Sequence, residues 1–261
     1  MRPLVDWQPG QLIGVFTDID DTLTTEGAIT PDALQALADL KTAGLQVVPI
    51  TGRPVGWSEP FAQSWPVDAI VAENGAVALV HTHGQPLRKL YQLDAATREA
   101  NFARMQQVLA RIEREVPGAR RAQDSAGRET DIAIDHSEFT RLPQAQIEAV
   151  MRLMQSEGMT ATVSSIHING WYGEHDKLVG ARWIVRELLG RDLDRELERW
   201  VYVGDSTNDQ AMFRHFTHSV GVANIRRFES QLAHPPRYIT QGERGAGFAE
   251  LVRHLLGAAA G

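Results

Sequence analysis

Residues 12–24 read LIGVFTDIDDTLT, and this stretch decides the fold. It opens with the apolar run Leu12 to Phe16, which has the length and composition of a strand buried on both faces. Two carboxylates and two hydroxyls follow at once, on Asp18, Asp20, Thr22 and Thr24. Because side chains alternate across a strand and fan out where it ends, Asp18 and Asp20 can converge on one point. The stretch therefore predicts a buried strand that delivers two acids to one edge of a sheet.

Two carboxylates held this close repel each other. Without a cation between them, the pKa of one would rise until it kept its proton through neutral pH. A hard divalent metal removes this conflict, and ligands that are all oxygen suit magnesium. We therefore expect Mg2+ as the cofactor, bound near Asp18 and Asp20.

The composition is that of an ordinary globular protein. The chain has 261 residues, of which 43% are hydrophobic and 23% charged, which is enough for one large domain or two smaller ones. The net charge is −7 and no block of like charges stands out, so we expect no nucleic-acid partner, although a small anionic substrate is compatible with it.

The absence of cysteine excludes disulfides, thiolate catalysis and cysteine zinc sites, and it fits the cytoplasm, which we take as the expected compartment. The first residues, MRPLVDWQPG, lack the apolar segment of a signal peptide. No apolar run approaches the roughly 18 residues of a membrane span, so we expect no membrane partner.

The first third of the chain alternates strand and helix patterns. The predicted strands are Leu12 to Phe16, Leu45 to Ile50 and Ala69 to Ala72, and the predicted helices are Thr30 to Ala43 and 54–64. In the first helix Leu34, Leu37 and Leu40 should share one face. Strands that are apolar throughout and alternate with helices predict a parallel sheet.

The same alternation resumes late in the chain. We expect a helix over 177–189 that Gly190 stops, a strand from Trp200 to Val203, a helix from 207, and short strands at Ser219 to Val222 and Arg237 to Ile239.

The stretch between the two halves follows a different pattern. Helical spacing from Met105 to Val116 precedes a strand at Thr130 to Asp135, and helical spacing from Ile147 to Met154 precedes strands at Thr160 to Val163 and Ile166 to Asn169. The fold class is therefore α/β, a Rossmann-like parallel-sheet core with an inserted α+β cap of helix-strand-strand repeated twice. We assign residues 1–86 and 172–261 to the core and 87–171 to the cap, which could act as a mobile lid.

Three further segments follow predicted strands or open a helix at the same sheet edge. They are the TGR loop (Thr51, Gly52 and Arg53), Lys177, and the run Gly204-Asp205-Ser206-Thr207-Asn208-Asp209. A cation in the first turn of a helix is unfavourable by roughly 0.3 to 1 kcal/mol, because the helix dipole is positive there. We therefore expect Lys177 to pair with a nearby negative charge. Asp205 lies where it could share one metal with Asp18.

Together these groups make a phosphoryl-transfer site. Asp18 would attack phosphorus to form an aspartyl phosphate, and Asp20 would protonate the leaving oxygen and later deprotonate water. Mg2+, Lys177 and Thr51 would spread the charge on the phosphoryl oxygens.

The motifs DIDDT, TGR, a lone lysine and GDSTND, in this order, resemble those of the haloacid dehalogenase-like superfamily of phosphatases. The position and repeat of the insert resemble the type-IIB cap of its sugar phosphatases. The resemblance implies that Asp18 is the nucleophile, Asp20 the acid and base, and Thr51 and Lys177 phosphate ligands. It also implies that Asp205 is a metal ligand, that the backbone carbonyl of Asp20 binds the metal, and that Asp209 supports the metal site or joins it. Asn208 could touch phosphate, and Asp21 departs from the family, where glycine is common.

Some residues keep two interpretations. Gly52 and Arg53 belong to the predicted substrate loop, but Arg53 could equally form a surface ion pair. Asp209 could act as a helix cap instead of a ligand. His167 and Asn169 share one face of a cap strand and could contact the leaving group, or that face could be exposed to solvent.

The function we predict is Mg2+-dependent hydrolysis of a small phosphorylated metabolite, a sugar or polyol phosphate, by a monomer or homodimer. A phosphomutase of the phosphomannomutase type is the first alternative, and a non-catalytic protein that binds sugar phosphates is the second. The proton-transfer group Asp20 argues against a protein that only binds.

Overall fold

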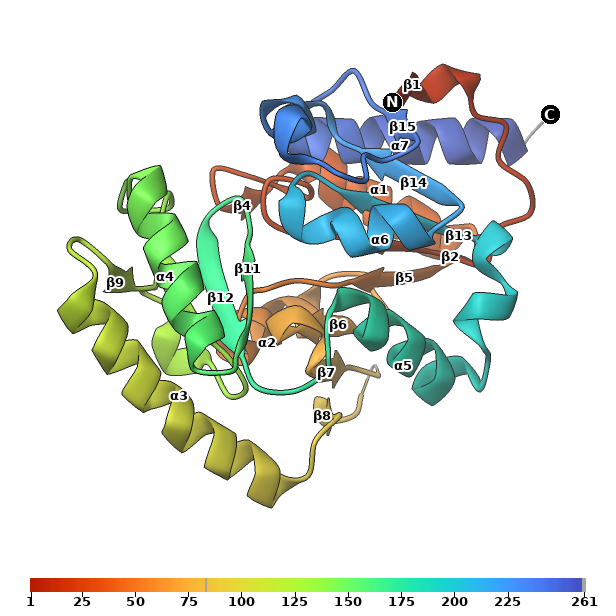
Figure 1. Ribbon diagram of the computed structural model, residues 1–261. Helices are drawn as coiled ribbons and strands as arrows, with labels where there is room; N and C mark the ends of the chain where they lie inside the picture. The colour runs from red at the N-terminus through yellow and green to blue at the C-terminus, as the bar shows by residue number, and fades with distance from the viewer. Residues whose placement is uncertain (83, 260–261) are drawn as a thin grey trace.

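The computed structural model describes residues 1–82 and 84–259 (Figure 1). Its centre is a six-stranded sheet in the order β1-β15-β14-β13-β2-β5, in which all neighbouring strands are parallel. The strands are β1 (Arg2–Pro3), β2 (Gly14–Thr17), β5 (Gln46–Pro49), β13 (Trp200–Gly204), β14 (His218–Gly221) and β15 (Tyr238–Ile239). Since β2 lies between β5 and β13, segments from before and after the insert build one sheet, and the predicted parallel core is confirmed.

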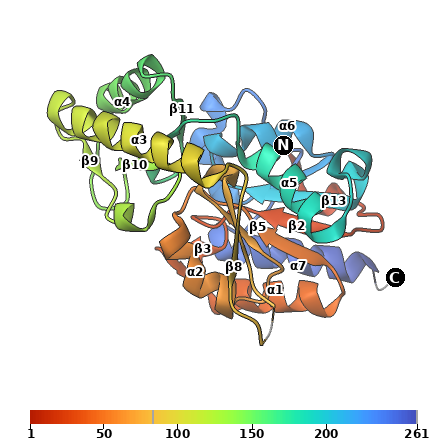
Figure 2. The same cartoon turned by 90° about the horizontal axis from the view of Figure 1, so that it is seen from below.

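Helices cover both faces of this sheet (Figure 2). One face carries α1 (Pro31–Thr42), α2 (Val55–Ser64) and α7 (Arg244–Ala259), and the other carries α5 (Lys177–Leu189) and α6 (Gln210–His215). Val15 packs with the first group and Phe16 with the second, and both are 0% exposed. Two consecutive residues of β2 are thus buried on opposite faces, which explains its unbroken apolar run.

One detail of α1 differs from the prediction. Leu37 and Leu40 are fully buried as expected, but Leu34 is 38% exposed. The small residues Ala33 and Ala36 lie on the buried face instead. This face packs against α7, where small side chains let two helices approach closely.

A second, antiparallel sheet extends the core beyond β5. It consists of β6 (Ile70–Ala72), β7 (Val77–Val80) and β8 (Arg88–Tyr91), and a parallel bridge between Ile50 and Val71 joins it to the main sheet. A short hairpin of β3 (Thr24–Thr25) and β4 (Ala28–Ile29) follows the DIDDT motif. Thus β8, which lies inside the range assigned to the cap, pairs with β7. The division of the chain after residues 86 and 171 stays a prediction.

The insert forms its own lobe beside the core (Figures 1 and 2). Its elements are α3 (Ala95–Glu115), β9 (Arg120–Arg121), β10 (Ile132–Asp135), α4 (Gln144–Ser156), β11 (Thr160–Val163) and β12 (His167–Trp171). The strands make an antiparallel sheet in the order β11-β12-β10-β9. The predicted helix-strand-strand repeat is therefore confirmed. Both helices pack with Ile168 in a separate hydrophobic core.

Two glycines fix where α5 begins. Gly75 has a φ of +106°, and a Cβ atom there would lie 2.2 Å from the carbonyl oxygen of Asp176. A Cβ on Gly180 would lie 2.6 Å from the Cα of Gly75. Only glycine at both positions lets α5 approach the turn after β6. This approach places the first residue of α5, Lys177, at the edge of the main sheet.

His175 lies in the segment that leads from the cap back to α5. Its ring stacks on Trp171, with the ring centroids 5.4 Å apart, and is only 4% exposed as a residue. Its Nε2 atom has no hydrogen-bond partner among the described residues. Burial lowers the pKa of His175 to about 4, so the ring stays neutral in the folded protein.

We expect this buried ring to make stability depend on pH. Below the ordinary pKa of 6.5 the unfolded chain binds a proton that the folded chain does not, so stability falls as pH falls from about 6.5 to about 4. His175→Phe keeps an aromatic ring there and should remove about 2 to 3 kcal/mol of the loss between pH 7 and pH 4.5. Urea denaturation at the two pH values measures it. The same substitution at the exposed His234 is the control, and equal losses in wild type and His175→Phe would contradict the assignment.

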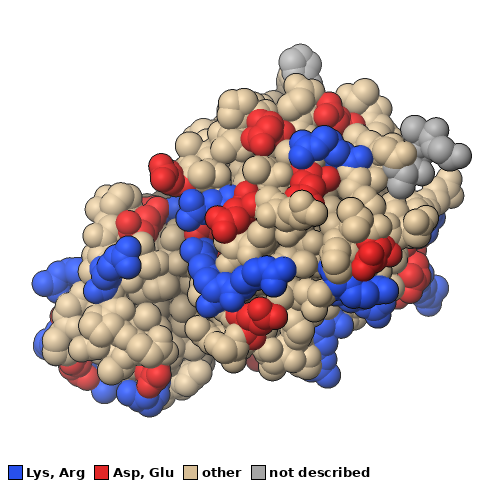
Figure 3. All heavy atoms as spheres, turned by 90° about the horizontal axis from the view of Figure 1, so that it is seen from above, with Lys and Arg blue, Asp and Glu red and all other residues tan. Residues whose placement is uncertain are grey.

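On the face shown in Figure 3, basic and acidic side chains lie interspersed. Among the described residues, no helix has both the length and the apolar character that crossing a membrane requires.

Candidate active site

The predicted motif residues gather at the carboxyl end of the main sheet. Asp18 follows β2, Thr51 follows β5 and Asp205 follows β13, and Lys177 opens α5 beside them. Since β2 has β5 on one side and β13 on the other, these ends are adjacent. The convergence that the sequence analysis predicted is therefore present.

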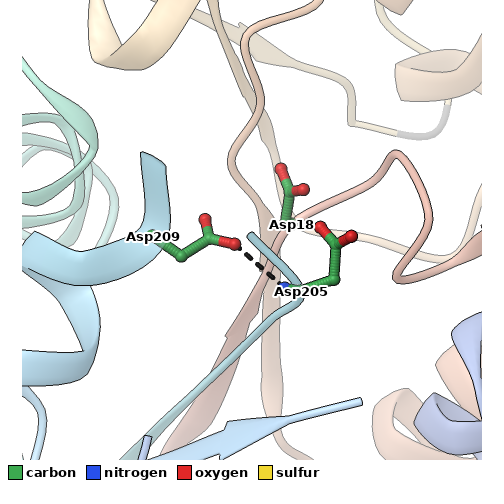
Figure 4. A group of neighbouring side chains, drawn as sticks. All are labelled: Asp18, Asp205 and Asp209. Carbon is green, nitrogen blue, oxygen red and sulfur yellow. Dashed lines mark hydrogen bonds between the residues drawn. The ribbon is translucent and has the colours of Figure 1, made fainter. Parts of the chain in front are cut away.

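Three buried carboxylates form the centre of the site (Figure 4). Asp18, Asp205 and Asp209 each offer an oxygen atom within 4.8 Å of the others, and none of the three is more than 4% exposed. Burial raises the pKa of Asp18 and of Asp205, and the charge of the neighbouring carboxylates raises it further. This is the electrostatic conflict that a bound cation would relieve.

Lys177 lies between two of these carboxylates. Its Nζ donates to Asp18 Oδ1 and to Asp209 Oδ1, both at 2.7 Å, and the side chain is 3% exposed. Burial alone would lower the pKa of Lys177, but the two carboxylates outweigh it and raise the pKa. Lys177 at the start of this helix pairs with local negative charge, as its unfavourable position predicted.

Asp209 uses both of its oxygens for hydrogen bonds from the protein. Oδ1 accepts from Lys177 and from the hydroxyl of Tyr202, while Oδ2 accepts from the backbone N–H groups of Asp205 and Ser206. It also belongs to a capping box with Ser206. Asp209 therefore orients Lys177 and the Asp205 loop and also caps the helix, while its role as a metal ligand stays a prediction.

Asp205 differs from Asp209 in leaving one oxygen free of such bonds. Its Oδ2 accepts from Asn224 and from Arg227, both at 3.1 Å. Its Oδ1 is buried and has no hydrogen-bond partner among the described residues. A buried carboxylate oxygen without a donor is costly unless something else binds it. This atom fits a metal ion shared with Asp18.

Asp21, the departure from the family pattern, has a φ of +56°, which suits glycine and which aspartate tolerates better than most residues. Its carboxylate pairs with Arg227 at 2.8 Å and with Arg244 at 3.0 Å. The extra anion is thus balanced, and Arg227 links Asp21 to Asp205.

The side chain of Asp20 points to Arg53 and not into the acidic cluster. Nε and Nη2 of Arg53 donate to Asp20 at 2.9 to 3.0 Å. Arg53 also donates to Glu138 at 2.6 Å and to Asp124 at 3.2 Å, both in the insert. Arg53 is 5% exposed. It therefore does form ion pairs, as one of the two interpretations expected, but they are buried and join core and cap.

The cap also binds the backbone of the TGR loop. The carbonyl oxygen of Gly52 accepts from Arg128 at 3.1 Å and from Asn169 at 3.3 Å. The Thr51 hydroxyl accepts the backbone N–H of Arg53 at 3.0 Å, which leaves its own proton to donate. The cap and the TGR loop are therefore in direct contact.

His167 and Asn169 face the core and are buried, at 2% and 1% exposed. Of the two interpretations given for this face, exposure to solvent is wrong. His167 Nε2 lies 2.8 Å from Glu138, and Asn169 donates to Asp131 at 3.0 Å. Burial would raise the pKa of Glu138, but hydrogen bonds from His167 and Arg53 lower it to about 2.

Asn208 lies in the one-turn helix η6 (Thr207–Asp209), where its Oδ1 accepts from the Ser206 hydroxyl. It borders a pocket of about 340 Å3 between this helix and the cap elements α4 and β11. Thr207 spans the boundary, since its hydroxyl donates to the carbonyl of Val163 in β11 at 2.9 Å.

The sequence analysis missed the cap acids and Arg128. Glu138 reaches Arg53 because the Asp135 carboxylate accepts the backbone N–H groups of four consecutive residues, Ser137 to Thr140, and so folds this loop. It also missed Glu73, a fully buried core carboxylate that accepts from Thr130 and Glu129 of the insert. Asp135 at the end of a predicted strand was the one local signal of such a loop.

Models of known protein families match both parts of the core. A family model described as haloacid dehalogenase-like hydrolase matches residues 15–113, and a model described as sucrose-6F-phosphate phosphohydrolase matches residues 184–255. No curated protein matches the chain.

Solved structures share the whole fold at low sequence identity. A protein from Thermoplasma acidophilum is 15% identical with a TM-score of 0.71, over 95% of this chain and 99% of that one. The sucrose-phosphatase from Synechocystis sp. PCC6803 is 15% identical with a TM-score of 0.63, over 94% and 98%. A sugar phosphatase of HAD subclass IIB, BT4131, is 15% identical with a TM-score of 0.61, over 94% and 99%.

The two family models fall on different halves of the active site. The first range contains Asp18, Asp20 and the TGR loop, and the second contains Asp205 and Asp209. The structure brings these halves together around Lys177. The two matches indicate a phosphatase, and over both halves of the candidate site the chain is similar to the haloacid dehalogenase-like hydrolases.

Proposed function

We propose that this phosphatase is a Mg2+-dependent phosphomonoesterase that hydrolyses a sugar or polyol phosphate through an aspartyl phosphate on Asp18. The observation that carries the proposal is the buried group of Asp18, Lys177 and Asp205 at one point of the sheet edge. A nucleophile, a fixed cation and a carboxylate that could hold a metal ion are parts that phosphoryl transfer uses. The substrate class is supported by the neighbour solved with sucrose and phosphate and by the neighbour described as a sugar phosphatase.

The residues present fit Mg2+. Asp18 and Asp205 would hold it through their side chains, since Asp205 Oδ1 is buried without a partner among the described residues. As the family resemblance implies, Asp20 would contribute its backbone carbonyl, while Arg53 binds its carboxylate. Asp209 would support the site through Lys177 and the Asp205 loop. When bound, Mg2+ would neutralise the acidic cluster and stabilise charge on the transferring phosphoryl group.

The chain's own residues would carry the reaction in two steps. A carboxylate oxygen of Asp18 forms a bond to phosphorus while the bond to the ester oxygen breaks, and that oxygen takes a proton from Asp20. Asp20 then takes a proton from water, whose oxygen attacks phosphorus and releases Asp18. The Thr51 hydroxyl and the Lys177 ammonium would hold the phosphoryl oxygens in both steps.

Arg53 would link the acid to the cap. Asp20 acts on the leaving oxygen only after its hydrogen bonds with Arg53 loosen, and Arg53 is also held by Glu138 and Asp124 of the insert. We infer that movement of the cap changes how firmly Arg53 holds the Asp20 carboxylate. Substrate binding between cap and core would then weaken the hydrogen bonds of Asp20 with Arg53 and let its side chain reach the leaving oxygen.

The test of the proposed function is hydrolysis of p-nitrophenyl phosphate by the intact chain. We expect hydrolysis with Mg2+, loss of it with EDTA, and recovery when Mg2+ is restored in excess. Full activity after exhaustive chelation would rule out the metal site, and no activity with any divalent metal would rule out the phosphatase reaction.

Binding of Mg2+ should also stabilise the fold, because it relieves the repulsion within the acidic cluster. At a concentration about 100 times its Kd, a ligand that binds only the folded state adds about 2.7 kcal/mol. We expect a rise in Tm with Mg2+ for wild type and for Asp39→Asn, a substitution on the exposed face of α1, but little rise for Asp205→Asn. An equal rise in all three proteins would show that the ion binds elsewhere.

A further inference from the structure

We propose that the leaving group of the substrate is uncharged and rich in hydroxyl groups, and that the site discriminates against substrates with a second anionic group. The proposal rests on the proposed phosphatase function and narrows its substrate class. It follows from the charges on the cap side of the TGR loop and from the lining of the pocket next to Asn208.

The cations on the cap side of the TGR loop are already bound by carboxylates. Arg53 pairs with Asp20, Asp124 and Glu138, and Arg128 pairs with Asp131 at 2.7 Å and with Asp124 at 3.1 Å. Both guanidinium groups are buried, at 5% and 4% exposed. A second phosphate or a carboxylate on the substrate would have to displace these buried partners, and the four carboxylates would repel it.

The pocket between cap and core offers hydrogen bonds without charge. It has a volume of about 340 Å3, and none of the residues that line it is charged. Its polar groups are the amides and hydroxyls of Gln144, Thr162, Thr207, Asn208, Gln210 and Gln231, and Ile147, Met151 and Val163 supply apolar surface. Amides and hydroxyls beside aliphatic surface match the hydroxyls and C–H faces of a sugar.

Two of the residues that line this pocket connect it to the candidate site. On the core side, Asn208 follows Asp205 by three residues in the same loop. On the cap side, Thr162 pairs with Asn169 across β11 and β12, so the two side chains share the face that meets Gly52. The Thr162 hydroxyl is buried and has no hydrogen-bond partner among the described residues. An unpaired hydroxyl at this place is ready to bind a hydroxyl of the leaving group.

The inference separates hydrolysis from the phosphomutase alternative. A mutase of this kind needs a bisphosphate, whose second phosphate must find a cation on the cap side. Here Arg53 and Arg128 are paired with carboxylates, and the adjoining pocket is uncharged. Hydrolysis of a monophosphate needs no such cation.

The first experiment compares substrates that differ by one charge. Glycerol 3-phosphate and 3-phosphoglycerate have the same chain length, but one ends in a hydroxymethyl group and the other in a carboxylate. Glucose 6-phosphate and glucose 1,6-bisphosphate make a second pair. We expect kcat/KM of wild type to favour the uncharged leaving group at least about tenfold in each pair. Equal values, or a preference for the anionic member, would overturn the inference.

The second experiment tests the pocket itself. Thr162→Val should lower kcat/KM for glucose 6-phosphate relative to p-nitrophenyl phosphate by about tenfold, the effect of one lost hydrogen bond. Thr160→Val makes the same change two residues earlier on β11, outside the pocket, and should leave the ratio unchanged. If both variants change the ratio equally, the pocket is not the leaving-group site.

A third variant adds a cation to the pocket wall. Met151→Lys should raise kcat/KM for 3-phosphoglycerate relative to glycerol 3-phosphate by about tenfold, whereas Met151→Gln, of similar size and neutral, should not. An unchanged ratio in Met151→Lys would count against the charge argument.

Failure of the proposed function would be recognised separately, because wild type would then hydrolyse none of these esters, p-nitrophenyl phosphate included. In that case binding of glucose 6-phosphate, measured as a rise in Tm, still tests the pocket. A rise that Thr162→Val weakens and Thr160→Val does not would support the inference, and any other pattern would overturn it.

Discussion

Replacing Asp18 by asparagine should abolish hydrolysis of p-nitrophenyl phosphate, with kcat at least about 10^4-fold lower than in wild type. Asparagine has nearly the same shape as aspartate, but its amide oxygen is neither charged nor able to form the aspartyl phosphate. Because both steps of the proposed reaction pass through the Asp18 carboxylate, no other carboxylate of the cluster should replace it. The measurement is steady-state kinetics with saturating Mg2+.

The fold should survive this substitution. Lys177 keeps its hydrogen bond with Asp209, and Asp205 loses a like-charged neighbour, so the free energy of unfolding without metal should stay the same or rise. Urea denaturation measures it, and Asp6→Asn, at an exposed position, is the matched control for both readouts. An active Asp18→Asn protein would reject Asp18 as the nucleophile. An inactive but unfolded one would show instead that its role is structural.

Replacing Lys177 by methionine should damage both activity and stability. The substitution keeps the length of the side chain but removes the cation between Asp18 and Asp209, two carboxylates that are 4% and 0% exposed. Loss of one partner from a buried ion pair costs about 3 to 5 kcal/mol, and loss of a group that stabilises the transition state costs about 10^2 to 10^3 in kcat. Urea denaturation and steady-state kinetics measure the two effects.

The chain offers a matched control for this substitution. Lys41 also binds an aspartate, Asp68, at 2.7 Å, but both side chains are partly exposed, at 29% and 23%. Lys41→Met should therefore cost only about 1 kcal/mol and leave kcat unchanged. If Lys177→Met were no more harmful than Lys41→Met, the buried cation could not be the group that holds the site together.

Much of the core, and the convergence of the motif residues at one sheet edge, could be predicted because the requirements are local. An apolar run followed by acidic residues predicts a buried strand whose end carries carboxylates, as in β2 before Asp18 and β13 before Asp205. A lysine at a helix start is costly enough to point to a nearby anion, and Lys177 meets two. Gly190 ends α5 in the left-handed conformation, with a φ of +62°, as glycine after a helical pattern predicts.

Other parts were missed because distant residues decide them. Strand β8 reads RKLY, and its charged, partly exposed side chains give no strand pattern until β7 lies beside it. Arg53 and Glu138 are 85 residues apart in sequence, and their contact depends on how the cap is placed over the core. The face of α1 was misjudged at Leu34, since the packing of α1 on α7, and not residue size, decides which side is buried.

The two cap donors on the Gly52 carbonyl limit how specificity can be redesigned. Transplanting the insert of another phosphatase onto this core would replace Arg128 and Asn169 together with the cap side of the pocket next to Asn208. A graft without equivalent donors would leave the TGR loop, which we propose to bind phosphate, less firmly held. Turnover would then fall for every ester, even one that fits the new pocket. Engineering should therefore retain those two side chains and alter the pocket wall one residue at a time.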